Sequence, residues 1–142
     1  MTSSRTLVGL ENLFLYGTLR PSALGRLGRV RRERLKKHSV SLGAASMAGR
    51  LYDLGFYPGA IESSLAGEHV HGEAVRMPDP SAIFDWLDVY EGIGAHGGSR
   101  FGFERVQRPV FLAGGDVIEA WVYLYRGALP LDRLIANGRW GK

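Results

Sequence analysis

Hydrophobic residues along this chain fall into short runs that are interrupted by glycine, a pattern typical of many short elements joined by tight turns. Residues 13–15 are apolar and stop at Gly17, which predicts a buried strand that leads into a turn. Alternation of apolar with polar or small residues predicts a strand at residues 40–44. Further strands are expected at residues 49–54 and 70–77, with an irregular turn over residues 55–59.

The last third of the chain predicts a β-hairpin. Residues 103–112 and 117–125 have the character of strands, and Ala-Gly-Gly-Asp joins them. The second strand has an aliphatic face and a mixed face, made respectively of Ile118, Ala120, Val122 and Leu124 and of Glu119, Trp121, Tyr123 and Tyr125. With two or three helices, this pattern predicts an α+β domain with a small, barrel-like sheet, mixed or largely antiparallel. Closure of the sheet would remove its exposed edges.

The clearest predicted helix begins after Met77. Asp79 suits the N-cap position, and Pro80 suits the first helical position. One apolar face follows at helical spacing, made of Ile83, Phe84, Leu87 and Tyr90. Gly92 is a suitable residue to end the helix. We therefore expect Glu91 at the C-terminal end, next to a buried face.

A basic segment follows the first predicted strand. Residues 20–37 contain eight basic residues and one acid, Glu33, so the segment carries +7 and the rest of the chain −3. Pro21 and a weak stripe of Leu24, Leu27 and Val30 predict a helix here. We favour a solvated helix face over a surface for nucleic acid, an anionic membrane or an acidic partner. The segment has no aromatic residue on which the bases of a single strand could stack.

Composition sets the broad class of protein. The 142 residues, 45% hydrophobic and 23% charged, fit one globular domain over residues 1–142, with residues 1–12 as a mobile extension. The chain has no cysteine, no signal-peptide pattern and no apolar run long enough to span a bilayer. We therefore expect a cytoplasmic protein that does not bind membranes. The sequence does not determine its oligomeric state.

Familiar cofactor motifs are missing from the sequence. It has no phosphate-binding loop, no dinucleotide-binding glycine fingerprint and no zinc-protease helix. His69 and His71 would share one strand face, but a third metal ligand at sensible spacing is not evident, and we favour two exposed strand histidines. We expect neither a metal nor a cofactor.

Two features suggest chemistry. The first is the Tyr-Gly-Thr-Leu-Arg turn of residues 16–20, where Gly17 permits close approach of the backbone and successive amide N–H groups can hold a carboxylate. The second is Glu91, because partial burial and the negative end of a helix dipole both raise the pKa of a carboxyl group. Such a group suits general acid–base catalysis.

These two segments and others between them resemble the γ-glutamyl cyclotransferase-like superfamily, in its compact bacterial-type or AIG2-like branch. The matching segments follow in order at residues 16–20, 49–52, 57–60, 70–73, 87–92, 120–123 and 135–140. No single motif is decisive, but their shared order is specific. The resemblance covers nearly the whole chain.

The resemblance implies a barrel with flanking helices, and a pocket at the first turn. It implies that Tyr16 and the amides of Gly17, Thr18 and Leu19 bind a small γ-glutamyl substrate, and that Glu91 is the catalytic residue. The reaction is release of 5-oxoproline from a γ-glutamyl amine or amino acid. It needs no metal, because the attacking amine is already tethered to the carbonyl group that it attacks.

One position departs from the family pattern. Many members carry Tyr-x-Arg where this chain has Phe103, Glu104 and Arg105. Tyr123 or Tyr125 would have to supply the missing phenol. If neither does, the alternative is a catalytically silent relative that binds small molecules. The glycine-rich residues 92–102 border Glu91, and we expect them to form a mobile rim over the pocket.

Overall fold

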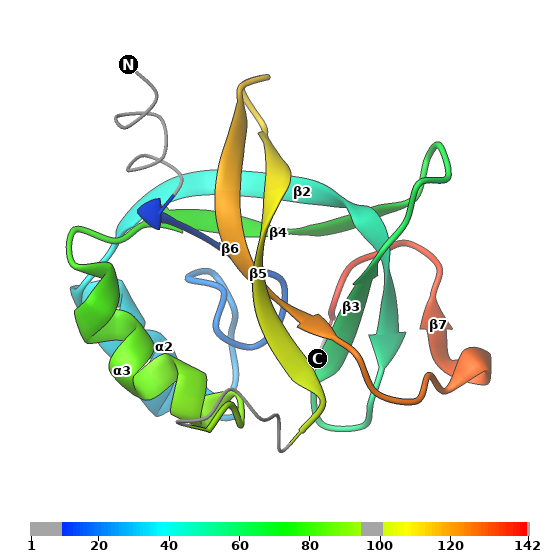
Figure 1. Ribbon diagram of the computed structural model, residues 1–142, viewed down its shortest axis with the longest axis horizontal. Coiled ribbons are helices and arrows are strands. Elements are labelled where there is room, and N and C mark those ends of the chain that lie inside the picture. The colour runs from blue at the N-terminus through cyan, green and yellow to red at the C-terminus, as the bar shows by residue number, and fades with distance from the viewer. Residues whose placement is uncertain (1–9, 95–100, 142) are drawn as a thin grey trace.

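The computed structural model describes residues 10–94 and 101–141, and it is built around a small closed barrel (Figure 1). In chain order the elements are β1 (Asn12–Leu15), α2 (Arg29–Lys37), β2 (Val40–Asp53), β3 (Pro58–Glu62), β4 (His69–Arg76), α3 (Pro80–Tyr90), β5 (Phe103–Leu112), β6 (Val117–Tyr125), the 3-10 turn η1 (Leu131–Arg133) and β7 (Leu134–Ile135). Five strands close the barrel in the order β2-β4-β1-β6-β5, with β5 returning to β2. Only the β1–β6 pair is parallel within this barrel. The predicted α+β fold with a mixed barrel is confirmed.

Strand β2 is longer than the sequence pattern predicts, and it pairs with four other strands. It is continuous over 14 residues, whereas two separate strands were expected at residues 40–44 and 49–54. Its first part pairs with β4 and β5 in the barrel, and its last part pairs with β3 and β7. Strand β3 itself was missed, because Pro58 and the glycine after it resemble a turn.

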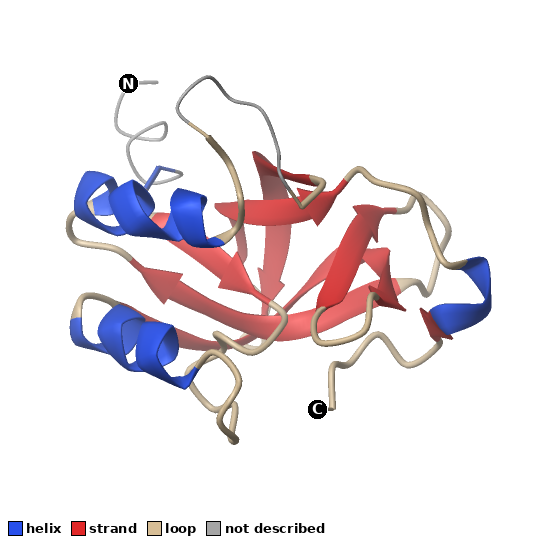
Figure 2. Cartoon of the chain, turned by 90° about the horizontal axis from the view of Figure 1, so that it is seen from below, coloured by secondary structure: helices blue, strands red, loops and turns tan. Residues whose placement is uncertain are grey.

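Two hydrophobic cores lie on opposite faces of the barrel wall. Phe14, Val122 and Leu124 face the barrel interior, whereas Leu13, Leu15 and Tyr123 face the helices. The predicted alternation along β6 is therefore confirmed. Both helices lie on the same side of the barrel (Figures 1 and 2), and β7 lies on the other.

The prediction for the basic segment was wrong in its position. The helix begins at Arg29, and the leucine stripe is solvent-exposed, with Leu24 at 87%. Gly28 has φ 75°, a left-handed conformation that separates the helix from the preceding turn. The helix instead buries Leu35 and Arg32, whose guanidinium donates to the carbonyls of Thr18 and Gly25 at 2.9 and 2.8 Å.

The structure confirms the helix predicted after Met77, which is α3. The Asp79 carboxylate accepts a hydrogen bond from the Ala82 amide at 3.4 Å, and Gly92 has φ 85° directly after the helix. Glu91 is the C-cap residue. Helix α2 is fastened to α3 by two basic side chains, Arg31 over the Tyr90 ring and Arg34 over the Trp86 ring.

Parts of the expected extension and rim fall outside the described residues. Residues 1–9 are not described, but Asn12 is buried in β1 and its side-chain amide donates to the Glu119 carbonyl at 3.0 Å. Of the expected mobile rim, residues 95–100 are not described. Among the described helices, none is long and apolar enough to cross a bilayer.

Candidate active site

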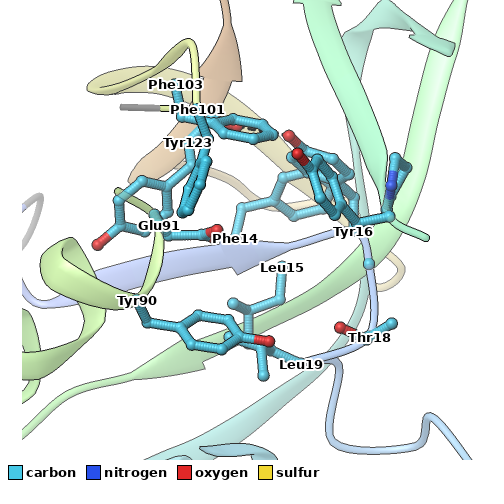
Figure 3. A pocket seen from close by; sticks show the side chains of 13 residues that line it. Phe14, Leu15, Tyr16, Thr18, Leu19, Tyr90, Glu91, Phe101, Phe103 and Tyr123 are labelled. Atoms are coloured by element: carbon cyan, nitrogen blue, oxygen red, sulfur yellow. Dashed lines mark hydrogen bonds between the residues drawn. The ribbon is translucent and has the colours of Figure 1, made fainter. Parts of the chain in front are cut away.

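A cavity of about 240 Å³ opens where β1 ends, between the C-terminal end of α3 and the adjoining ends of β5 and β6. Aromatic, aliphatic and turn residues line it together with one carboxylate: Phe14, Leu15, Tyr16, Gly17, Thr18, Leu19, Tyr57, Pro58, Tyr90, Glu91, Phe101, Phe103 and Tyr123 (Figure 3). The structure thus brings the Tyr-Gly-Thr-Leu turn and Glu91, which are more than 70 residues apart in the sequence, to one cavity.

Hydrogen bonds from arginine side chains to carbonyl groups hold the turn in place. Arg20 Nε donates to the Gly17 carbonyl at 2.8 Å, and its Nη2 donates to the Trp140 carbonyl at 3.0 Å. The Thr18 carbonyl accepts from Arg32. No acceptor for the amide N–H groups of residues 17–19 is found within the described part of the chain. Two arginines therefore fix the turn from its carbonyl side and leave its amide donors for a ligand.

Glu91 points from the end of α3 into the ring of lining side chains (Figure 3). Part of the residue is accessible, as expected for a residue that lines a cavity, but burial raises the pKa of its carboxyl group to about 7. The negative charge of Asp88 raises it further in the same direction. Within the described residues, the carboxylate has no hydrogen-bond or ion-pair partner that would oppose this shift.

Burial and the negative charge of Glu91 raise the pKa of three tyrosines, Tyr16, Tyr90 and Tyr123. Burial, and then Glu91, raise the pKa of Tyr16 far above its usual range. The Tyr16 hydroxyl donates to the Tyr123 carbonyl at 2.5 Å and accepts from the Ala60 amide at 3.2 Å. Both hydrogen-bonding roles of this hydroxyl are filled by the backbone. Tyr16 therefore lines the cavity with its ring and ties β1 to β3 and β6.

Tyr90 and Tyr123 flank Glu91. Burial, and then Glu91, raise the pKa of Tyr90, whose hydroxyl also hydrogen-bonds the Thr18 side chain. Burial, and then the hydrogen bond to Asp88, raise the pKa of Tyr123. The Tyr123 hydroxyl donates to Asp88 Oδ1 at 2.6 Å.

Asp88 belongs to a network that the sequence analysis missed. Arg105 Nε and Nη2 donate to its two carboxylate oxygens at 2.9 and 3.2 Å. The Arg105 guanidinium is stacked between Phe84 and Trp121, at 3.8 and 4.4 Å from the ring centroids. Asp88 and Glu91 are three residues apart and so share one side of α3, which is the sequence signal that could have indicated their coupling.

The two residues considered as replacements for the missing phenol lie in different places. Tyr123 lines the cavity, but Tyr125 does not. The Tyr125 ring instead packs edge-on against Phe103, with centroids 5.5 Å apart. Phe103 itself lines the cavity, and Tyr57 packs on it at 5.9 Å. Phe101 falls within residues 92–102, which were expected to border the pocket, and Tyr57 falls within the matching segment 57–60, but neither was named as a site residue.

The two histidines of β4 remain apart from the cavity. The His69 and His71 rings are 6.4 Å apart, and no group of three possible ligands for a metal ion is found among the described residues. The chemically distinctive feature of the described surface is thus the cavity itself, which combines free amide donors, a carboxyl group that titrates near neutrality and apolar walls. These groups can bind a small anion and move protons beside it.

Known proteins share both the sequence pattern and the fold. The profile of the family described as "Gamma-glutamyl cyclotransferase, AIG2-like" matches residues 13–142. A Vibrio cholerae protein, provisionally named as a gamma-glutamylcyclotransferase, is 31% identical over 130 residues, covering 90% of this chain and 93% of that protein.

Two solved structures show the likeness in fold. YkqA from Bacillus subtilis matches 92% of this chain with a TM-score of 0.64 and 20% identity, although the chain spans only 39% of YkqA. An AIG2-like protein from Mus musculus matches 85% of this chain, and 80% of its own length, with a TM-score of 0.64 and 18% identity. Because the family profile matches residues 13–142, the chain belongs to the gamma-glutamyl cyclotransferase, AIG2-like family.

Proposed function

We propose that this protein is a lyase that releases 5-oxoproline from a small γ-glutamyl amine or amino acid. The observation that carries the proposal is the position of Glu91, whose pKa burial raises to about 7, in the same cavity as residues 17–19, whose amides have no acceptor among the described residues. The amides would hold the α-carboxylate of the γ-glutamyl group. That contact would bring its α-nitrogen and its γ-carbonyl toward Glu91.

The reaction is an exchange of one amide bond for another. The α-nitrogen of the substrate attacks its own γ-carbonyl carbon, a carbon–nitrogen bond forms, and the bond to the leaving amine breaks. Two protons must pass from the α-ammonium group to the leaving nitrogen, which departs as an ammonium ion. Glu91 would take each proton as a carboxylate and return it as a carboxylic acid.

The pKa of Glu91 suits this shuttle. A group with a pKa of about 7 is populated in both protonation states near neutral pH, so it can act as base and then as acid in one turnover. Holding the tethered amine in the reactive rotamer would add to the rate acceleration, since the attack is intramolecular.

The test is a comparison of the wild-type protein with Glu91→Gln. Each would be incubated with a panel of γ-glutamyl amines and dipeptides, and 5-oxoproline would be measured by mass spectrometry. Glutamine keeps the size and polarity but cannot carry the proton, so we expect kcat to fall by about 10²-fold or more. The matched control is Glu33→Gln, which changes an exposed carboxylate on α2 and should leave turnover unchanged.

Phe103 supports a second candidate function, a catalytically silent module that binds small γ-glutamyl compounds. Phe103 lines the cavity without a hydroxyl, and the Tyr123 hydroxyl is engaged by Asp88. Binding of the panel by a folded wild-type protein, without 5-oxoproline from any member, would favour this module over the enzyme.

A further inference from the structure

A second hollow, of about 370 Å³, lies between α2 and the loop that follows the turn at residues 16–20. None of its described lining residues lines the cavity that contains Glu91. Charged side chains dominate it: Arg26, Arg29, Arg32, Glu33 and Lys36, with Pro21, Ala23, Leu24 and Gly25 beside them. The one carboxylate among them, on Glu33, is 3.7 Å from Lys36 Nζ. The three arginines therefore have no carboxylate of their own in this lining.

Arg32 is the most buried of these arginines, with 5% of its surface exposed. Its guanidinium donates three hydrogen bonds, all to backbone carbonyls, which are those of Thr18, Gly25 and Leu27. A guanidinium has five N–H groups. The Nε–H and one N–H of Nη2 therefore have no acceptor in the part of the chain that the structure describes. Buried charges are normally paired with an opposite charge, so Arg32 is a strong site for an anion.

Arg105 shows what the unused edge of Arg32 can bind. Its Nε and Nη2 donate to the two carboxylate oxygens of Asp88 at 2.9 and 3.2 Å. This fork is the geometry in which guanidinium groups hold carboxylate and phosphate oxygens. Arg32 has N–H groups to spare on the same two nitrogens, and the acceptor that they fit is an oxyanion.

Two further guanidinium groups favour a doubly charged oxyanion. Arg26 and Arg29 are exposed, and within the described residues their side chains have no hydrogen-bond or ion-pair partner. A phosphate monoester carries a charge of about −1.5 to −2 at pH 7 and three acceptor oxygens, so it matches three arginines better than a carboxylate does. A volume of about 370 Å³ is also in the range of small-molecule sites.

We propose that this hollow binds the phosphate group of a small phosphate monoester. Arg32 holds phosphate oxygens through Nε and Nη2, and Arg26 and Arg29 hold others through their guanidinium groups. The organic part of the molecule packs against the apolar side of the hollow, where Leu24 is 87% exposed. The same guanidinium of Arg32 donates to the Thr18 carbonyl, so the site adjoins the substrate turn from its carbonyl side. The inference does not depend on the proposed cyclotransfer.

The test is an NMR titration of the protein with inorganic phosphate, phenyl phosphate and acetate at neutral pH. Ionic strength is held constant, because screening alone changes the interactions of exposed charges. Proton–nitrogen-15 spectra would follow the arginine Nε–H signals. The Arg32 signal is assigned from its loss in Arg32→Lys, or by through-bond correlation if that variant does not fold.

Both phosphates should shift the Arg32 signal in a saturable manner, and acetate should require a concentration higher by about tenfold or more. Phenyl phosphate should bind at least as tightly as inorganic phosphate, because its ring adds apolar contact. Weaker binding of phenyl phosphate would assign the hollow to the free ion and overturn the monoester.

A pair of double variants assigns the effect to the hollow. Arg26→Gln with Arg29→Gln should raise the Kd for phenyl phosphate by about tenfold or more. The matched control is Lys37→Gln with Arg133→Gln, which removes two positive charges from exposed residues outside the hollow and should change the Kd by less than about twofold. Thermal denaturation would verify that both variants fold.

Two results would overturn the site. Equal losses of affinity in the two double variants would mean that the net charge of the protein, rather than the hollow, attracts the anion. Shifts confined to exposed arginines, without saturation at Arg32, would mean that phosphate only joins the ions around a basic surface, as a larger polyanion would. Saturation at Arg32 that is lost in the variant of Arg26 and Arg29 alone supports the proposal.

Discussion

The last turn of α3 carries two carboxylates, three residues apart, in opposite surroundings. Asp88 accepts two hydrogen bonds from Arg105 and one from the Tyr123 hydroxyl. Glu91 has no such partner among the described residues, and burial raises its pKa to about 7. Both side chains come from the same helix end, so the helix dipole alone does not separate them.

The difference shows how the fold assigns two roles to two similar acids. The carboxylate of Asp88 is hydrogen-bonded by a guanidinium and a phenol. The negative charge of Asp88 raises the pKa of Glu91, for which no ion-pair partner is found among the described residues. Asp88 is thus held by neighbouring side chains, whereas Glu91 lines the cavity without a hydrogen-bond partner among the described residues.

The largest expected consequence concerns stability. Because the pKa of Glu91 is about 7 in the folded protein and near 4.5 without its surroundings, ionisation of Glu91 opposes folding. The stability that its protonated form provides is fully present below pH 4.5 and is lost as the pH rises through 7. Glu91→Gln should therefore raise the free energy of unfolding by up to about 3 kcal/mol at pH 8.

Urea denaturation of both proteins at pH 4.5 and pH 8 would measure this difference. At pH 4.5 the two proteins should have nearly equal free energies of unfolding, because Glu91 is protonated in the folded state. An equal difference at both pH values would show that the carboxyl group of Glu91 is not destabilised by its surroundings.

How far could the sequence predict this arrangement? Local signals sufficed for α3, because Asp79, Pro80 and Gly92 act within one or two turns of the helix. The strict alternation along β6 likewise indicated two faces, which the structure fills with two separate cores. Resemblance to a family then added the connection between the turn at residues 16–20 and Glu91.

Other features depend on contacts that no local pattern encodes. The leucine stripe of the basic segment suggested an early helix, but Arg32 is buried there instead, since the carbonyls of Thr18 and Gly25 supply its partners. The family pattern included Arg105, but no local pattern connects it with Asp88, 17 residues away in the chain. The Arg105–Asp88 pair follows from the packing of α3 against β5 and β6.

A pair of variants would sharpen the contrast between the two acids. Asp88→Asn removes the negative charge beside Glu91 and should lower its pKa, whereas Arg105→Met removes the cation that balances Asp88 and should raise it. Shifts of roughly half a unit to one unit are expected, in opposite directions. Methionine keeps an apolar side chain between the rings of Phe84 and Trp121.

Carbon-13 NMR titration of the glutamate carboxyl groups would follow these shifts without requiring turnover, with the Glu91 resonance assigned from its loss in Glu91→Gln. The acidic limb of kcat/KM against pH should move with the NMR value. Shifts of the same sign in both variants would mean that Asp88 and Arg105 act on Glu91 through packing rather than charge.

The smallest expected effect decides whether Tyr123 belongs with Asp88 or with the substrate. Its hydroxyl already donates to Asp88 Oδ1 at 2.6 Å, so Tyr123→Phe should remove one hydrogen bond and about 1 kcal/mol of stability. Turnover should change by no more than about threefold, because the hydroxyl is engaged by Asp88 and is not expected to contact the substrate. Tyr125→Phe, on the same face of β6 but outside the cavity, is the control for each measurement. A loss of 5-oxoproline formation of a hundredfold or so in Tyr123→Phe alone, with the stability change as expected, would mean that the phenol leaves Asp88 and acts on the substrate in place of the hydroxyl that Phe103 lacks.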